Sequence, residues 1–265
     1  MPDQRSAIVT GASSGIGRAI AIEFGHLGWR VALGARRQDR LEEAATAVAA
    51  AGGVGRALPL DVRDANAVAA FFAAAATAIG PVDVLVNNAG VATPGWLHEL
   101  PVEAVQRDVS TNLLGPLLTS RLAIASIRAR GATGDLVFIT SDATRHPRPR
   151  MAPYTATKAG VEALAQSLAL ELEGTGIRAT TVRVGPTVSE FGFGWPTDDL
   201  EDLMAYWPRF GLQRHAGVLD PSVVARAVRT AVTAPPGVLL DTIEVQPEAP
   251  VGARGPATII ERPAD

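Results

Sequence analysis

The feature of this sequence that most constrains its fold is a repeated alternation of short apolar runs with longer segments of helical periodicity. Runs typical of strands lie near residues 5–9, 30–35, 55–59, 83–87, 134–140, 177–184 and 238–245. Helical patterns lie near residues 15–28, 38–51, 64–79, 102–129, 154–173 and 221–234, with a further piece inside 197–208. Strict alternation predicts a parallel sheet with helices on both faces. Right-handed crossovers then make it a doubly wound α/β fold of the Rossmann type.

A glycine-rich turn joins the first expected strand to the first expected helix. It has the sequence TGASSGIG over residues 10–17. Its three glycines allow a tight turn, close approach of the backbone to a pyrophosphate and close packing of helix on strand. The helix that follows offers free amides and the positive end of its dipole to phosphate. The turn therefore predicts a dinucleotide site, with contacts from Gly11, Ser13, Ser14, Gly15, Ile16 and Gly17.

A tyrosine and a lysine four residues apart form the expected reaction centre. Tyr154 and Lys158 fall on the same face of an expected helix. A phenol with a pKa near ~10 is a weak acid–base group at neutral pH, and an adjacent ammonium lowers that pKa. Ser141 ends an apolar run, and open α/β sheets bind their ligands at the carboxyl ends of strands. Such a pair alone is more typical of a solvated helix face, but together with the glycine-rich turn it favours an enzyme.

Together these motifs resemble the classical short-chain dehydrogenase/reductase family. The resemblance spans residues 7 to about 190 and takes in Asn87-Asn88-Ala89-Gly90 and Asn112 in the family's order and spacing. It implies a seven-stranded sheet of order 3-2-1-4-5-6-7 and reversible hydride transfer between a nicotinamide cofactor and a carbonyl/alcohol pair. It also implies four catalytic roles: Tyr154 as general acid or base, Lys158 as the group that lowers its pKa and binds ribose, Ser141 as the group that orients the carbonyl, and Asn112 in the proton path.

Asn112 and Pro116 lie four residues apart in the expected helix 102–129. Proline lacks the N–H that would bond to the carbonyl of residue 112, so the sequence predicts that this carbonyl is free. The resemblance implies that the carbonyl holds a water linked to Lys158. The alternative is an ordinary proline kink.

The end of the second strand bears on the choice of dinucleotide. An acidic residue at this position binds a ribose 2′-hydroxyl, whereas an arginine accommodates a 2′-phosphate. Here Ala35 stands in the acid's place and Arg36 and Arg37 follow it. The sequence therefore favours NADP, with NAD possible, and the alternative is an exposed basic turn that opens a helix.

Further cofactor contacts are implied by the resemblance. They are expected from Asp61 and Val62 for the adenine, from Asn88, Ala89 and Gly90 beside the dinucleotide, and from Gly185, Thr187 and Ser189, in addition to Tyr154 and Lys158. The loop after the sixth strand departs from the family's usual Pro-Gly, since Val184 precedes Gly185. Asp61 could instead cap a helix, although Asp64 is the better cap.

Aromatic residues gather in the insertion of residues 188–217, after the sixth strand. They predict either an apolar substrate lid or a set of anchors that hold the insertion to the sheet. The expected substrate pocket consists of Trp96, Ser141, Asp142, Ala143, Phe191, Trp195 and Trp207. The substrate is then a small, apolar carbonyl or alcohol. The basic run of residues 145–150 is expected to be a solvated loop.

Composition restricts the remaining classes. The absence of cysteine excludes disulfides, thiolate nucleophiles and cysteine-bound zinc, and four scattered histidines offer no metal-ligand spacing. A net charge of −3 argues against a nucleic-acid partner. The apolar runs are too short for a membrane span and the polar N-terminus enters a strand at once, so we expect a cytoplasmic protein.

The organisation that follows is one dinucleotide-binding catalytic domain over residues 1–265, with an irregular tail over 246–265 that is rich in Pro and Gly. Small and apolar faces on the helices 102–129 and 154–173 suit the homodimer or homotetramer that the resemblance implies. The alternatives are an NAD-dependent alcohol dehydrogenase of the same family, a catalytically silent dinucleotide-binding protein, and a relative that catalyses epimerisation or dehydration.

Overall fold

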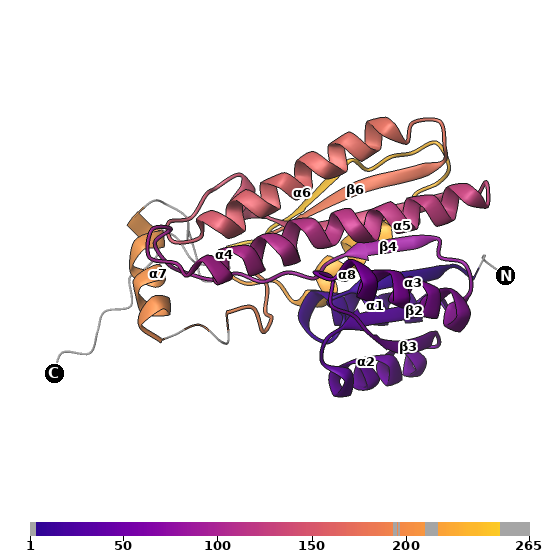
Figure 1. Ribbon diagram of the computed structural model, residues 1–265, viewed down its shortest axis with the longest axis horizontal. Helices are drawn as coiled ribbons and strands as arrows, with labels where there is room; N and C mark the ends of the chain where they lie inside the picture. The colour runs from indigo at the N-terminus through magenta and orange to yellow at the C-terminus, as the bar shows by residue number, and fades with distance from the viewer. Residues whose placement is uncertain (1–3, 193–194, 196, 210–216, 250–265) are drawn as a thin grey trace.

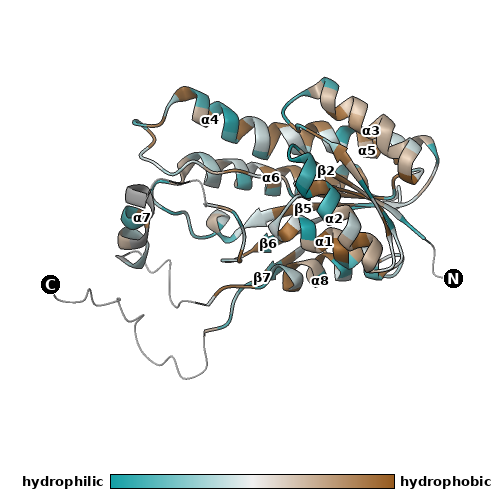
Figure 2. Ribbon diagram, turned by 90° about the horizontal axis from the view of Figure 1, so that it is seen from below, coloured by the Kyte–Doolittle hydropathy of each residue, from teal (hydrophilic) through white to brown (hydrophobic). Residues whose placement is uncertain are grey.

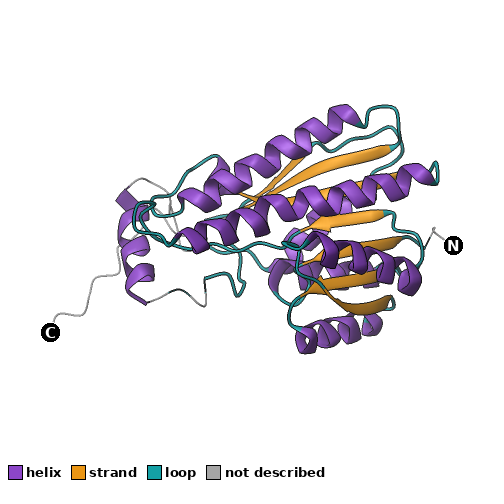
Figure 3. Cartoon of the chain, viewed as in Figure 1, coloured by secondary structure: helices purple, strands orange, loops and turns teal. Residues whose placement is uncertain are grey.

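Seven parallel strands form one sheet in the order β3-β2-β1-β4-β5-β6-β7, drawn in orange in Figure 3. The computed structural model describes residues 4–192, 195, 197–209 and 217–249. The strands are β1 (Ser6–Thr10), β2 (Arg30–Ala35), β3 (Val54–Pro59), β4 (Val84–Asn87), β5 (Gly134–Ser141), β6 (Ile177–Val184) and β7 (Thr242–Val245). The predicted parallel sheet and the strand order implied by the family are both confirmed.

Helices cover both faces of this sheet (Figures 1 and 2). One face carries α1 (Gly15–His26), α2 (Gln38–Ala50) and α8 (Pro221–Val232). The other carries α3 (Ala65–Ile79), α5 (Gly115–Ala129) and α6 (Ala152–Glu171). Beyond the carboxyl ends of the strands lie α4 (Val102–Val109) and α7 (Thr197–Arg209).

Each face of the sheet has its own apolar core. Phe24 and Leu41 lie in the core beneath α1 and α2, and Phe71 and Ile127 lie in the core beneath α3 and α5. Every residue of β1 and of β5 is buried because helices cover both sides. This explains why the strands appear in the sequence as continuous apolar runs rather than as alternating patterns.

The expected helix over 102–129 is interrupted, which corrects the sequence-based boundary. A π-helical turn, η1 (Ser110–Leu114), separates α4 from α5, and the amide of Gly115 donates to the carbonyl of Ser110, five residues back. Pro116 follows in the first turn of α5, where a missing N–H is tolerated. π-helical turns of this kind occur mostly as single turns inside α-helices.

Two further boundaries bear on the predictions. The last strand is only Thr242–Val245, and Val238 at the start of the expected run is exposed. The helical piece expected inside 197–208 is α7.

Some expected features lie outside the described part of the chain. These are residues 193–194, 196 and 210–216 of the expected lid and residues 250–265 of the expected tail. None of the described helices has the length and apolarity that crossing a bilayer requires.

Candidate active site

The carboxyl ends of the strands open into a cavity of about 1080 Å³. Its walls include most of the expected cofactor residues: Gly11, Ser13, Ser14, Gly15, Ile16, Arg36, Arg37, Asp61, Val62, Asn88, Ala89, Gly90, Tyr154, Lys158, Gly185, Thr187 and Ser189. Of the expected substrate residues, Ser141, Asp142, Phe191, Trp195 and Trp207 also line it. One cavity thus brings together motifs that lie far apart in the sequence.

The glycine-rich turn forms a tightly packed wall of this cavity. Gly11 has φ +66°, and a Cβ there would lie 2.8 Å from the Cα of Ala89. A Cβ at Gly17 would collide with the side chain of Asn88 and the carbonyl of Gly11, so Gly17 packs behind the turn and does not line the cavity. The backbone can approach a ligand closely only because these side chains are missing. The cradle therefore fits the pyrophosphate of a dinucleotide, which the start of α1 would hold by its amides.

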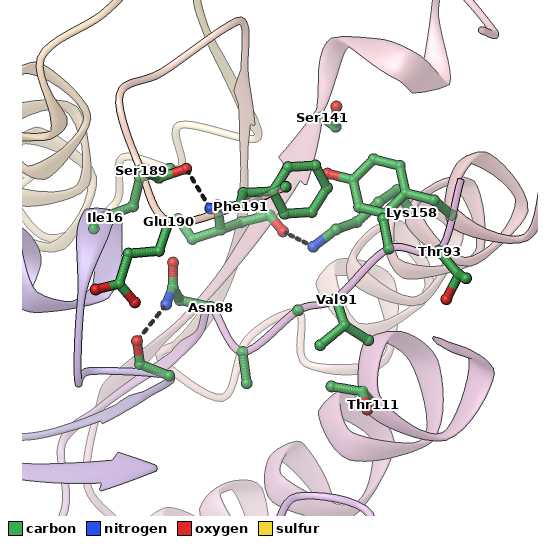
Figure 4. A pocket seen from close by; sticks show the side chains of 18 of the residues that line it. Ile16, Asn88, Val91, Thr93, Thr111, Ser141, Lys158, Ser189, Glu190 and Phe191 are labelled. Atoms are coloured by element: carbon green, nitrogen blue, oxygen red, sulfur yellow. Dashed lines mark hydrogen bonds between the residues drawn. The ribbon is translucent and has the colours of Figure 1, made fainter. Parts of the chain in front are cut away.

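The end of β4 braces the turn from the side. The side-chain amide of Asn88 donates to the carbonyls of Thr10 and Gly11, at 2.9 and 3.2 Å. The Thr10 hydroxyl accepts from the backbone amides of Asn88 and Ala89. Asn88 thus connects β4 to the loop that follows β1, and Figure 4 shows its side chain at the cavity wall.

The residues of the expected reaction centre lie at the start of α6 and the end of β5. Tyr154 and Lys158 are buried one turn apart on α6, and Lys158 Nζ lies 5.8 Å from the centroid of the Tyr154 ring. Lys158 Nζ also donates to the carbonyl of Ile139 at 2.9 Å. Ser141, the last residue of β5, faces Val184 of β6 in the register and is buried. The three side chains line the same cavity, where Figure 4 labels Ser141 and Lys158.

Burial shifts the pKa values of this centre. It raises the pKa of Tyr154 to about 12, while a hydrogen bond with Ser141 acts in the opposite direction. It also lowers the pKa of Lys158 to about 8. The expectation that the ammonium lowers the pKa of Tyr154 is therefore not met, because the loss of hydration outweighs the hydrogen bond.

Asn112 lies in the π-helical turn, beneath the cavity rather than on its wall. Its Oδ1 accepts from the amide of Val91, and its Nδ2 donates to the carbonyl of Val91 and to the hydroxyl of Thr157. A Cβ built on Gly90 would lie 3.4 Å from Lys158 Nζ and 3.5 Å from Asn112 Oδ1. The side chain of Asn112 therefore ties the loop after β4 to α6. The free carbonyl of Asn112 stays a prediction.

At the adenosine end, the second arginine after β2 reaches the glycine-rich turn. Arg37 Nη2 donates to the hydroxyls of Ser13 and Ser14, at 3.2 and 3.0 Å, and to Glu190 Oε2 at 2.7 Å. Arg36 is exposed at the same end of the cavity. The contact with Glu190 was not predicted, because it joins residues 153 positions apart.

Asp61 lies beside these arginines at the end of the third strand. Arg63 donates to both of its carboxylate oxygens and holds the pKa of Asp61 below its usual value. Asp64, not Asp61, caps α3, since its carboxylate accepts from the amides of Asn66 and Ala67. The cap prediction is therefore confirmed.

The basic run of residues 145–150 contains two buried side chains, which corrects the expectation of a solvated loop. Arg148 pairs with Asp142 through two hydrogen bonds of 2.9 and 2.7 Å, and each side chain is only 10% exposed. Arg150 has a positive φ of 64° and donates to Asp202 of α7 at 2.6 Å. Both arginines line the cavity. The sequence offered one signal for the buried pair, because Asp142 lies next to Ser141 and only six residues before Arg148.

Aromatic rings line one part of the cavity. The ring of Phe191 lies 5.3 Å from that of Tyr154 and 5.4 Å from that of Trp195, and Trp195 Nε1 donates to the carbonyl of Ala92. The guanidinium of Arg148 lies 5.1 Å from the centroid of the Trp207 ring.

Two expected pocket residues do not line the cavity. Trp96 instead packs edge-on against Tyr206 of α7, with the ring centroids 5.6 Å apart. Ala143 is fully buried beneath the wall. Neither residue lies where the sequence placed it, because Trp96 packs on α7 and Ala143 packs into a buried apolar cluster.

A doubly wound parallel sheet with a glycine-rich turn at its first crossover and a Ser–Tyr–Lys centre in the same cavity defines an NAD(P)-binding oxidoreductase. A sequence profile of the short chain dehydrogenases matches residues 5–197. The chain belongs to the short-chain dehydrogenase/reductase family, oxidoreductases that act on CH–OH groups with NAD(P).

Individual relatives agree with this assignment. A glycine betaine reductase, ATRR, of Emericella nidulans is 37% identical over 241 residues, which are 91% of this chain but only 18% of that protein. The chain therefore spans less than a fifth of the length of this relative. An alcohol dehydrogenase from the archaeon Thermococcus sibiricus, complexed with 5-hydroxy-NADP, is 31% identical, with a TM-score of 0.78 over 92% of this chain and 96% of the other. A 3-ketoacyl-(acyl-carrier-protein) reductase from Brucella melitensis, complexed with NADH, is 25% identical, with a TM-score of 0.78 over 92% and 97%.

Proposed function

We propose that this protein is an NADP(H)-dependent oxidoreductase that interconverts a carbonyl and a secondary alcohol on a small, apolar molecule. The observation that carries the proposal is that Tyr154, Lys158 and Ser141 line the same cavity as the glycine-rich turn. A proton donor and a dinucleotide cradle thereby line one cavity. The cofactor, when bound, supplies or accepts the hydride.

Tyr154 moves the proton in this proposal. Because burial raises its pKa to about 12, the phenol is protonated at neutral pH and can donate to the oxygen of a carbonyl that is being reduced. Ser141, which is buried at the end of β5, orients that oxygen with its hydroxyl. Lys158 binds the ribose of the nicotinamide half and offers a cation to the developing oxyanion.

Asn112 acts as a positioning residue for this centre. Its three hydrogen bonds to Val91 and Thr157 hold the loop after β4 against α6. Gly90 lies between Asn112 and Lys158. Because a glycine has no side chain, it leaves this space open for the proton path.

The preference for NADP(H) rests on the end of β2. Ala35 cannot bind a ribose hydroxyl by its side chain, whereas Arg36 and Arg37 line the cavity with guanidinium groups suited to a phosphate. The relative from Thermococcus sibiricus was solved with an NADP derivative, and the one from Brucella melitensis with NADH. NAD(H) is therefore the second candidate cofactor.

The proposal of an apolar substrate is based on the aromatic wall made by Phe191, Trp195 and Trp207.

We also propose that the protein is cytoplasmic and forms a homodimer or homotetramer. In support of an assembly, α4, η1 and α5 expose apolar side chains, among them Val102, Val109, Leu114 and Leu117.

The test is a panel of carbonyl compounds with NADPH and NADH, followed by the absorbance of the reduced cofactor. We expect oxidation of NADPH with aryl, cyclic or long-chain ketones and aldehydes, and slower reaction with small keto acids. Binding of cofactor without turnover across the panel would instead identify a silent dinucleotide-binding protein. A preference for small acids would turn attention to Arg148 and Arg150.

A further inference from the structure

The side chain of Arg37 sits in a site built for an anion. Its Nη2 lies within hydrogen-bond distance of the hydroxyls of Ser13 and Ser14, next to the start of α1. A guanidinium, two hydroxyls and a helix N-terminus are groups that together favour a phosphate or a carboxylate.

The chain places an anion of its own in this site. Glu190 Oε2 accepts from Arg37 Nη2 at 2.7 Å, the shortest of the three contacts of that nitrogen. Glu190 comes from the loop after β6, one residue after Ser189, whose Cβ would lie 3.1 Å from a Cβ built on Gly15. Figure 4 shows Glu190 reaching from this loop towards the side of the cavity where Ile16 and Asn88 lie.

The arrangement accounts for the charge of Glu190. A glutamate is ionised at neutral pH, and the hydrogen bond from Arg37 lowers the pKa of Glu190 further below its usual value. The side chain of Glu190 is 38% exposed and that of Arg37 is 48% exposed. An ion pair with this exposure is weak and can be exchanged for another anion at small cost.

We propose that Glu190 is a cofactor-selectivity residue, whose carboxylate competes with the 2′-phosphate of NADP(H) for Arg37. The inference rests on the proposed function insofar as Arg37 is taken to bind that phosphate. A 2′-phosphate and a carboxylate repel each other at hydrogen-bond distance from one guanidinium, so Glu190 beside Arg37 weakens the binding of the phosphate. NAD(H) has only a neutral 2′-hydroxyl at this position, and the Arg37–Glu190 pair can persist beside it. Glu190 thus reduces the preference for NADP(H) that the arginines alone would give.

The test uses Glu190→Gln, which keeps the shape of the side chain and removes its charge. The matched control is Glu42→Gln on α2, an exposed carboxylate that accepts from Gln38. Dissociation constants are measured by titration calorimetry for NADPH and NADH, and for 2′-AMP and 5′-AMP as phosphate probes without a nicotinamide. These are binding measurements and need no turnover.

We expect Glu190→Gln to lower the dissociation constants of NADPH and 2′-AMP roughly three- to tenfold. The constants of NADH and 5′-AMP should change less than about twofold, and the gain should shrink in high salt because screening weakens exposed charges. Glu42→Gln should change none of the four.

Equal changes for both cofactors, no change at all, or weaker binding of NADPH and 2′-AMP would each overturn the proposal. Weaker binding of NADH alone would show that Glu190 holds a ribose hydroxyl instead, and would overturn it as well. Because 2′-AMP has no nicotinamide, its result is independent of whether the protein turns over a carbonyl. The experiment thereby distinguishes a failure of the proposed oxidoreductase function from a failure of the proposed role of Glu190.

Discussion

Lys158 and Tyr154 lie one helical turn apart on α6, both buried, with Lys158 Nζ 5.8 Å from the centroid of the phenol ring. Burial acts on them in opposite directions, since it raises the pKa of Tyr154 to about 12 and lowers the pKa of Lys158 to about 8. Both shifts favour the uncharged form. Folding with Tyr154 or Lys158 charged therefore costs free energy, and this cost depends on pH.

The first prediction concerns stability against pH. The pKa of Lys158 is about 8 in the folded protein and 10.5 ordinarily, so the unfolded chain binds more protons between these values. Stability therefore rises with pH over this window. We expect Lys158→Met to be stabilising at pH 7 and this gain to shrink by about 2 kcal/mol at pH 9.5.

Urea unfolding of both proteins at the two pH values checks this. The comparison stays below pH 10 because the raised pKa of Tyr154 makes stability fall above that value. A gain that is constant or grows with pH would contradict the burial of Lys158 as a cost.

The second prediction concerns the two arginines after β2. Arg36→Ala and Arg37→Ala should each weaken NADPH far more than NADH, since only NADPH carries a 2′-phosphate. A lost charge-assisted hydrogen bond is worth roughly 1.5–3 kcal/mol, which is about ten- to a hundredfold in the dissociation constant. Fluorescence titration of each variant with both cofactors gives the ratio. Equal effects on the two cofactors would show that neither arginine binds the 2′-phosphate.

The third prediction concerns the Asp142–Arg148 pair on the cavity wall. Asp142→Leu alone leaves a buried guanidinium without its carboxylate, and removing one partner of such a pair costs about 3–5 kcal/mol. The double variant Asp142→Leu/Arg148→Met should recover most of that loss, because no uncompensated charge is left. A double-mutant cycle from urea unfolding measures the coupling. Additive effects, or a single-variant loss below about 1 kcal/mol, would show that the pair is effectively solvated.

The fold was predictable because its signals are local. Continuous apolar runs such as that of β5 arise from helices on both sides, and Asp64 marks the start of α3 by a cap that involves only its neighbours. The strand order came from the family resemblance carried by the glycine-rich turn, Asn112, Ser141, Tyr154 and Lys158. These motifs are compact enough to be recognised without knowledge of distant contacts.

The features that the sequence did not predict depend on residues far apart in the chain. The pair between Arg37 and Glu190 and the pair between Arg150 and Asp202 join segments separated by 153 and 52 positions. A pattern of spacing within one helix or strand contains no information on such pairs. The raised pKa of Tyr154 was also missed, because it depends on burial by the surrounding loops rather than on Lys158 one turn away.

The most direct test of Tyr154 as the general acid is the rate of carbonyl reduction by Tyr154→Phe, measured in single turnovers with NADPH bound. Phenylalanine keeps the ring against Phe191 and removes only the hydroxyl. We predict unchanged NADPH binding and a rate lower by roughly 10²–10⁴-fold, the usual worth of a general acid. A variant that keeps more than about a tenth of the wild-type rate, with chemistry still limiting, would contradict the assignment.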